Sequence, residues 1–152
     1  MKPSKKLIAA ACAALMMAGA AHAADSHTIT VNATVAGTCK FNSATSTVTM
    51  TLDPTLSTNV NQSGSVQYRC TKGTTPAFAL SSGSTSSAVG GNLVNGAESI
   101  PYTFSSASGG DGTGMAAGQE KTLSVTVTVN QANAANVTPA TYSDTIAITL
   151  TP

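Results

Sequence analysis

Apolar and polar residues alternate with a period of two in seven stretches of this chain. The stretches cover residues 28–35, 47–52, 66–70, 78–80, 100–104, 123–129 and 145–151. Successive side chains of a β-strand point to opposite faces, so each stretch predicts a strand with one apolar face and one polar face. Clusters of Gly, Asn, Asp, Ser and Pro separate the stretches and favour turns. The pattern therefore predicts one all-β domain built as an antiparallel sandwich.

The last alternating stretch lies at the C-terminal end of the sequence. Its apolar residues Ile146, Ile148 and Leu150 share one face, and no further alternating stretch follows them. We expect the sandwich to lack a closing strand at this place. The three side chains would then line an apolar acceptor groove beside an open sheet edge.

The first alternating stretch lies shortly after the N-terminal apolar region. It places Ile29, Val31, Ala33 and Val35 on one face. If this stretch enters the open groove of a neighbouring molecule, its apolar side chains leave water and complete the neighbour's sandwich. Such a donor strand predicts a head-to-tail homopolymer, because the two contacting surfaces differ. Alternatively, residues 28–35 form the first strand of their own domain.

The N-terminal residues have the features of a secretory signal. Lys2, Lys5 and Lys6 precede an apolar run, and Ala21-His22-Ala23 fits a small-x-small cleavage site. The apolar run has about 14 residues, fewer than the ~20 that a membrane-spanning helix needs. We expect an exported protein that does not span the membrane. Its parts would be a signal peptide (1–23), a donor-strand segment (24–35) and the β-sandwich domain (36–152).

The cysteines after the signal form an even pair. Cys12 lies within the signal peptide, which leaves Cys39 and Cys70 in the exported part. Exported proteins encounter an oxidising environment in which such pairs form disulfides. The sequence therefore predicts a Cys39–Cys70 disulfide.

Charge and residue inventory exclude several function classes. The four basic and six acidic residues after residue 23 give a formal net charge of −2 without a basic cluster, so we expect no binding of nucleic acid. His27 is the only histidine in that part, and the acidic residues stand beside turns or at strand ends. We find no catalytic triad, carboxylate pair or metal-ligand set, and predict a protein that is not an enzyme and needs no cofactor or metal.

Three features together carry a family resemblance. Gly37-Thr38-Cys39 follows the first stretch, the second cysteine closes Val66-Gln67-Tyr68-Arg69-Cys70, and Thr141-Tyr142-Ser143-Asp144-Thr145-Ile146 opens the last stretch. In these features the chain resembles the spore coat protein U domain, which is shared with the major subunits of archaic chaperone–usher pili. The resemblance implies an incomplete immunoglobulin-like sandwich that lacks its last strand. It also implies two assembly partners, a periplasmic pilus chaperone and an outer-membrane usher.

These observations lead to one hypothesis. The chain is a structural subunit that passes through the periplasm and polymerises by donor-strand exchange into a cell-surface pilus, supporting adhesion and biofilm formation. The alternatives are a spore or surface coat protein, and a secreted monomeric module that binds carbohydrate. The last is less favoured, because most of the six aromatic residues after residue 23 fall on the apolar phase of their stretches.

Overall fold

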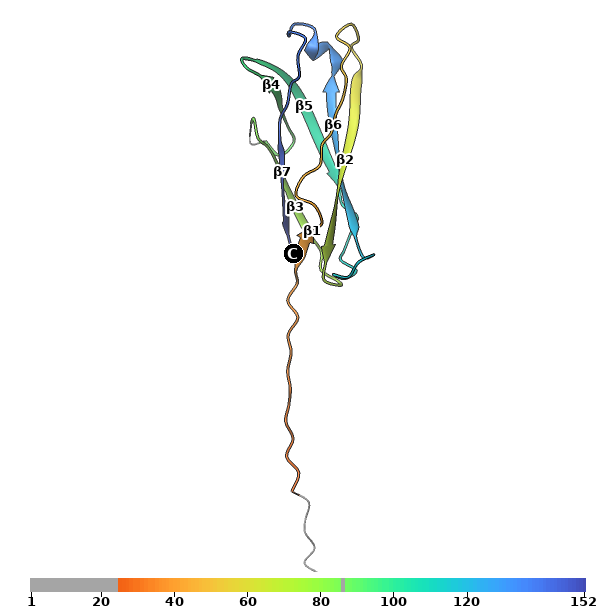
Figure 1. The fold of residues 1–152 in the computed structure, drawn as a ribbon, viewed down its shortest axis with the longest axis vertical. Helices are drawn as coiled ribbons and strands as arrows, with labels where there is room; N and C mark the ends of the chain where they lie inside the picture. The colour runs from red at the N-terminus through yellow and green to blue at the C-terminus, as the bar shows by residue number, and fades with distance from the viewer. Residues whose placement is uncertain (1–24, 86) are drawn as a thin grey trace, which may run out of the picture. The chain divides into compact units, whose positions relative to one another are not determined.

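The alternating stretches assemble into two antiparallel sheets, shown in Figure 1, which we describe from a computed structural model covering residues 25–85 and 87–152. The strands are β1 (Cys39–Phe41), β2 (Asn59–Cys70), β3 (Ala77–Ser82), β4 (Gly90–Asn95), β5 (Glu98–Ala107), β6 (Lys121–Asn130) and β7 (Ile146–Thr151), with a 3-10 turn η1 (Gln131–Ala134) after β6. One sheet has the order β1-β2-β6-β5-β4, and the other consists of β3 and β7. The all-β sandwich predicted from the sequence is thereby confirmed.

The core lies on the inner face of the five-stranded sheet. Alternate residues of its central strands are buried, as the period of two requires. They are Tyr68, Cys70, Ile100, Tyr102, Phe104, Leu123, Val125, Val127 and Val129. Phe78 of β3 covers this face from the other sheet, with its ring edge-on to Tyr68 at a centroid distance of 5.0 Å.

The strand pattern differs from the sequence prediction before β3 and again at β4. Residues 28–35 and 47–52 form no strand, whereas β1 and β4 are strands that the alternation did not indicate. β2 also begins earlier than expected, because residues 61–64 belong to its ladder with β6 and do not form a turn. Pairing with a neighbouring strand thus outweighs the weak local preference of these residues for a turn or a strand.

Residues 34–152 form one compact unit, of which the described residues 25–33 are not part. The predicted signal peptide, residues 1–23, lies outside the described residues. Within the described ranges, no helix is long and apolar enough to cross a membrane.

Candidate strand-acceptor site

β7 has a hydrogen-bonded neighbour strand on one side only, as far as the described residues go. It pairs antiparallel with β3 along its whole length. Just before β7, the N–H of Gly83 donates to the carbonyl oxygen of Thr145 over 2.7 Å. Hydrogen-bonded and non-hydrogen-bonded pairs alternate along an antiparallel ladder. This bond therefore fixes which residues of β7 direct their backbone groups toward β3.

The alternation turns the backbone groups of Ile146, Ile148 and Leu150 away from β3. Ala147 and Thr149 turn theirs toward it. Among the described residues, no backbone hydrogen bond outside the β3 ladder reaches the three outward-facing residues. The outer edge of β7 therefore presents free N–H and C=O groups at the spacing that an added strand requires.

The side chains of the same three residues face the core but remain half-buried. Phe78 and Leu80, their neighbours on β3, are half-buried as well. Apolar surface left in water costs about 25 cal/mol per Å² relative to buried surface. Covering this side of the sandwich would therefore be favourable, as expected for the acceptor groove predicted from Ile146, Ile148 and Leu150.

The chain between β1 and β2 runs between β7 and β2 in the view of Figure 1. Its residues Val48, Met50 and Leu52 are half-buried and alternate with exposed neighbours, as in a strand. Val48 packs on β2, where its Cγ2 lies 2.5 Å from the position of a Cβ added to Gly64. Residues 43–52 make no backbone–backbone hydrogen bond with another described residue. The stretch predicted as a strand over 47–52 thus has the required alternation but no ladder partner.

A carboxylate holds the start of β7 against both sheets. Oδ2 of Asp144 accepts hydrogen bonds from the hydroxyls of Ser82 (2.6 Å), Ser84 (2.7 Å) and Tyr102 (2.8 Å). Burial raises the pKa of Asp144, but these hydrogen bonds outweigh burial and keep the pKa below its usual value. Burial, assisted by the bond to Asp144, raises the pKa of Tyr102 to about 12. Asp144 is therefore an anionic hub for the three hydroxyls.

Tyr142 fixes the turn that leads into β7. Its hydroxyl oxygen lies 2.6 Å from Oε2 of Glu98 and 2.9 Å from the carbonyl oxygen of Thr138. The next residue, Ser143, exchanges backbone hydrogen bonds of 2.9 and 3.2 Å with Val94 of β4. The chain is thus bound to the five-stranded sheet at Ser143 and crosses to β3 immediately afterwards. Neither Tyr142 nor Asp144 was singled out as a structural anchor by sequence reasoning, although both lie in the Tyr-Ser-Asp-Thr motif.

The strand order matches an immunoglobulin-like sandwich that is short of one strand. In that fold, strands A, B, E and D form one sheet, and strands C, F and G form the other. β1, β2, β6 and β5 occupy the places of A, B, E and D, and β3 and β7 occupy those of C and F. The tyrosine hydroxyl bonded to backbone upstream of β7 is also typical of the corner before strand F. The place of strand G is therefore the free edge of β7.

A disulfide lies near one end of this site. Cys39 and Cys70 face each other across the β1–β2 ladder and are covalently joined, as the sequence predicted. Next to the bond, the N–H of Thr38 donates to Oγ1 of Thr71 (3.0 Å), and the N–H of Thr71 donates to the carbonyl oxygen of Thr38 (2.9 Å). The chain is therefore tied to the body of the sandwich from Thr38 onward.

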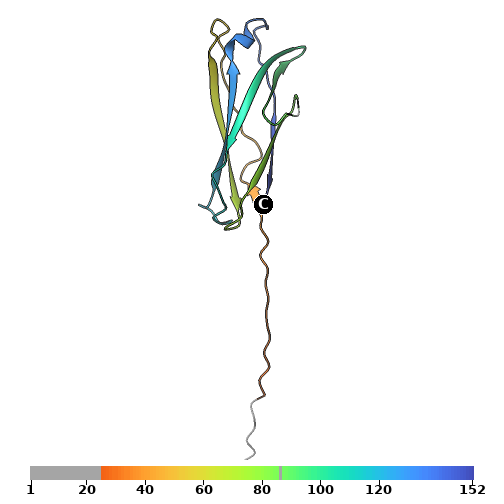
Figure 2. The same ribbon diagram turned by 180° about the vertical axis from the view of Figure 1, so that it is seen from behind.

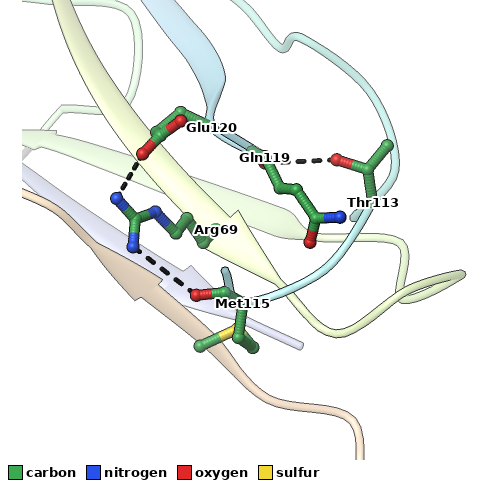
Figure 3. Close-up of polar contacts among 5 residues, drawn as sticks. All are labelled: Arg69, Thr113, Met115, Gln119 and Glu120. Carbon is green, nitrogen blue, oxygen red and sulfur yellow. Dashed lines mark hydrogen bonds and ion pairs between the residues drawn. The ribbon is translucent and has the colours of Figure 1, made fainter. Parts of the chain in front are cut away.

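An ion pair and a loop cover the same end of the domain (Figure 3). Arg69 of β2 pairs with Glu120, and its Nη1 lies 3.5 Å from the carbonyl oxygen of Met115. Oγ1 of Thr113 donates to the carbonyl oxygen of Gln119 over 3.1 Å and closes the loop. The backbone N–H of Glu120 and the Arg69 guanidinium lower the pKa of this carboxyl, so the pair is ionised. The loop before β6 is thereby attached to β2.

The predicted donor residues form no strand in this structure. Ile29, Val31 and Val35 are 77%, 85% and 84% exposed, and Ala33 is exposed as well. The first strand begins only at Cys39, so residues 28–35 are not the first strand of the sandwich in this structure. Exposed apolar side chains that share one face of a stretch are an available surface for a partner. The structure thus groups the predicted groove residues and leaves the predicted donor residues in solvent.

Comparison with known proteins gives one match. The family model of the Spore Coat Protein U domain matches residues 25–149. No curated protein and no solved structure matches the chain. The matched range includes the exposed stretch, the disulfide and the first four of the six residues of β7.

Proposed function

Because the chain belongs to the Spore Coat Protein U domain family, we propose that it is a structural subunit of a secreted surface pilus. This is a structural family of pilus and coat proteins and includes subunits of chaperone–usher pili. In the proposed fibre, residues 28–35 of one subunit form a strand between β7 and residues 43–52 of the next. The same contact, repeated along the chain of subunits, builds a head-to-tail polymer.

The observation that carries this proposal is the free edge of β7 with its half-buried apolar side chains. The donor stretch offers three large side chains to this groove, Ile29, Val31 and Val35. Burying each is worth about 1.5–3 kcal/mol, roughly 5–9 kcal/mol together before ordering costs. This is comparable to the ~5–15 kcal/mol that stabilises a whole domain. We therefore expect a marginally stable isolated subunit and a polymer that resists denaturation.

The proposed assembly route follows from the same groove. A subunit that exposes an unpaired edge needs protection on its way through the periplasm, which a pilus chaperone would supply by lending a strand. An outer-membrane usher would then exchange that strand for the N-terminal stretch of the next subunit. The finished fibre would lie outside the cell and support adhesion and biofilm formation. A role in a coat would use the same intermolecular strand.

The test uses the full-length exported chain with the double substitution Ile29→Asn/Val31→Asn. Polar side chains on the donor face should abolish fibres in electron micrographs and leave monomers in gel filtration. The matched control is Thr28→Asn/Thr30→Asn, which changes the opposite face of the same stretch and should leave fibre yield within about twofold, because exposed positions tolerate substitution. Normal fibres from Ile29→Asn/Val31→Asn would rule out donation by this stretch. A wild-type protein that stays a stable monomer would instead favour the secreted binding module.

A further inference from the structure

The charged residues of the sandwich are divided between its two ends. Figure 2 shows the β2–β3 turn and the loop between β5 and β6 at the end that carries the C-terminus, and η1 and the β4–β5 hairpin at the other. The first end, here called the basic end, carries four basic residues and two acidic ones: Lys40, Arg69, Lys72, Lys121, Asp111 and Glu120. The second, the acidic end, carries only Asp53, Glu98 and Asp144. These nine are all the charged residues from position 34 onward.

Most of these charges remain available for an intermolecular contact. At the basic end, Arg69 is neutralised by Glu120, whereas Lys40 and Lys72 are exposed. At the acidic end, Asp53 is exposed and Glu98 is partly exposed. Hydrogen bonds from Thr55 lower the pKa of Asp53, and those from Thr138 and Tyr142 lower the pKa of Glu98. Both carboxylates are therefore charged at neutral pH.

The spacer between the donor stretch and the sandwich is short. The stretch ends at Val35, and the chain is tied to the basic end by hydrogen bonds at Thr38. Three residue steps of extended chain span at most about 11 Å. A subunit whose stretch is seated in a neighbour must therefore bring its own basic end close to the mouth of the neighbour's groove.

The groove along β7 has one mouth at each end of the domain. The mouth near Pro152 is part of the basic end, and it already holds the subunit's own chain, since a Cβ on Gly37 would lie 4.0 Å from Cβ of Pro152. An incoming basic end would meet occupied space and like charge there. The mouth near Ile146 opens on the acidic end, beside Asp144 and Glu98. Space and charge both favour this second mouth.

We propose that the basic end of each subunit docks on the acidic end of the next and forms a second contact in the fibre. This inference rests on the proposed strand donation, which sets the spacing, and adds a partner surface that the donated strand does not require. Exposed charges held within a Debye length of about 8 Å at physiological salt interact and steer association. The contact should therefore speed assembly at low ionic strength and lose its effect at high ionic strength.

The test is a charge swap in the full-length exported chain. Lys72→Glu should slow fibre elongation about 3- to 10-fold in ~20 mM salt, measured by light scattering, and the difference should vanish near 0.5 M salt. Adding Asp53→Lys should restore the rate to within about twofold of wild type, because the swapped charges again attract. The matched control, Ser63→Glu/Ser65→Glu, produces the same change in net charge in the middle of β2 and should stay within about twofold of wild type.

Two outcomes would overturn the proposed end-to-end contact. One is a Lys72→Glu variant that elongates like wild type at every salt concentration. The other is a Lys72→Glu/Asp53→Lys variant that is no faster than Lys72→Glu alone. Either result leaves strand donation intact if wild type still forms fibres and Ile29→Asn/Val31→Asn does not. If Ile29→Asn/Val31→Asn formed fibres as wild type does, strand donation would be ruled out, and with it the end-to-end contact that depends on it.

Discussion

β6 and β7 have the same alternating pattern, yet the sandwich buries them to different degrees. The apolar residues of β6, from Leu123 to Val129, are 0–8% exposed, whereas Ile146, Ile148 and Leu150 of β7 are only half-buried. β6 lies between β2 and β5, while β7 has β3 alone. Alternation therefore determines which side chains face inward, and the number of neighbouring strands determines how much water those side chains retain.

The largest loss of stability expected from this comparison is near the start of β6. Leu123→Ala removes a fully buried side chain from a strand that has neighbouring strands on both sides. The free energy of unfolding should fall by about 3–5 kcal/mol, measured by urea denaturation of the subunit. Thr122→Ala, on the opposite face of the same strand, is the control and should change it by less than about 0.5 kcal/mol. A cost for Leu123→Ala below about 1 kcal/mol would contradict a core centred on β6.

An intermediate effect is expected where β7 is attached to the other elements. In Asp144→Asn, an amide replaces the carboxylate that accepts from three hydroxyls, so the free energy of unfolding should fall by about 1–3 kcal/mol at pH 7. Because folding lowers the pKa of Asp144, the contribution of the carboxylate is complete above its unfolded pKa of about 3.9 and declines as the pH falls through the folded value. Urea denaturation between pH 7 and pH 2 should therefore show the two proteins converging in acid. If the difference in free energy of unfolding between the two proteins stayed constant over this pH range, protonation of Asp144 would not be linked to folding.

The smallest effect is expected at the half-buried face of β7. Ile148→Ala should lower the free energy of unfolding of the isolated subunit by about 1–2 kcal/mol, roughly half the cost at a fully buried site. A bound strand should cover Ile148, so the cost should rise when a peptide of residues 25–36 is added. Ala147→Ser, on the exposed face, is the control and should leave the free energy of unfolding unchanged both with and without the peptide. If Ile148→Ala cost the isolated subunit as much free energy of unfolding as Leu123→Ala does, the groove would already be closed without the peptide.

Strong alternation was sufficient to place most strands from the sequence. β3, β5, β6 and β7 coincide with predicted stretches, because their inward residues are large and regularly spaced. β4 was missed because Gly90 and Gly91 favour a turn when considered locally. In the structure, a Cβ on Gly90 would lie 2.4 Å from the carbonyl oxygen of Tyr102, so tight packing against β5 requires glycine there. Such a requirement depends on a residue distant in sequence and has no local signal.

Only part of the candidate site could likewise be predicted from the alternating pattern. The inward face of β7 and the cysteine pair follow from local pattern and residue count. The hub at Asp144 depends on Ser82 and Tyr102, which are brought together only when β3 and β5 pack beside the start of β7. Hydrogen bonds among distant polar side chains leave no periodic trace in the sequence, so sequence reasoning recognised the Tyr-Ser-Asp-Thr motif without finding its structural role.

The position of the disulfide has a mechanical consequence for a fibre of the proposed kind. Pulling on the donor stretch would transmit force through Thr38 to Cys39, and from there across the covalent bond directly to Cys70 at the end of β2. The load would thus bypass residues 42–58, which have few backbone hydrogen bonds and would otherwise peel away first. It would instead act lengthwise on β2, whose ladder with β6 extends over Asn59 to Tyr68 and must shear as a whole. The subunits of such a fibre would therefore resist being unravelled by a pull on their donor stretches.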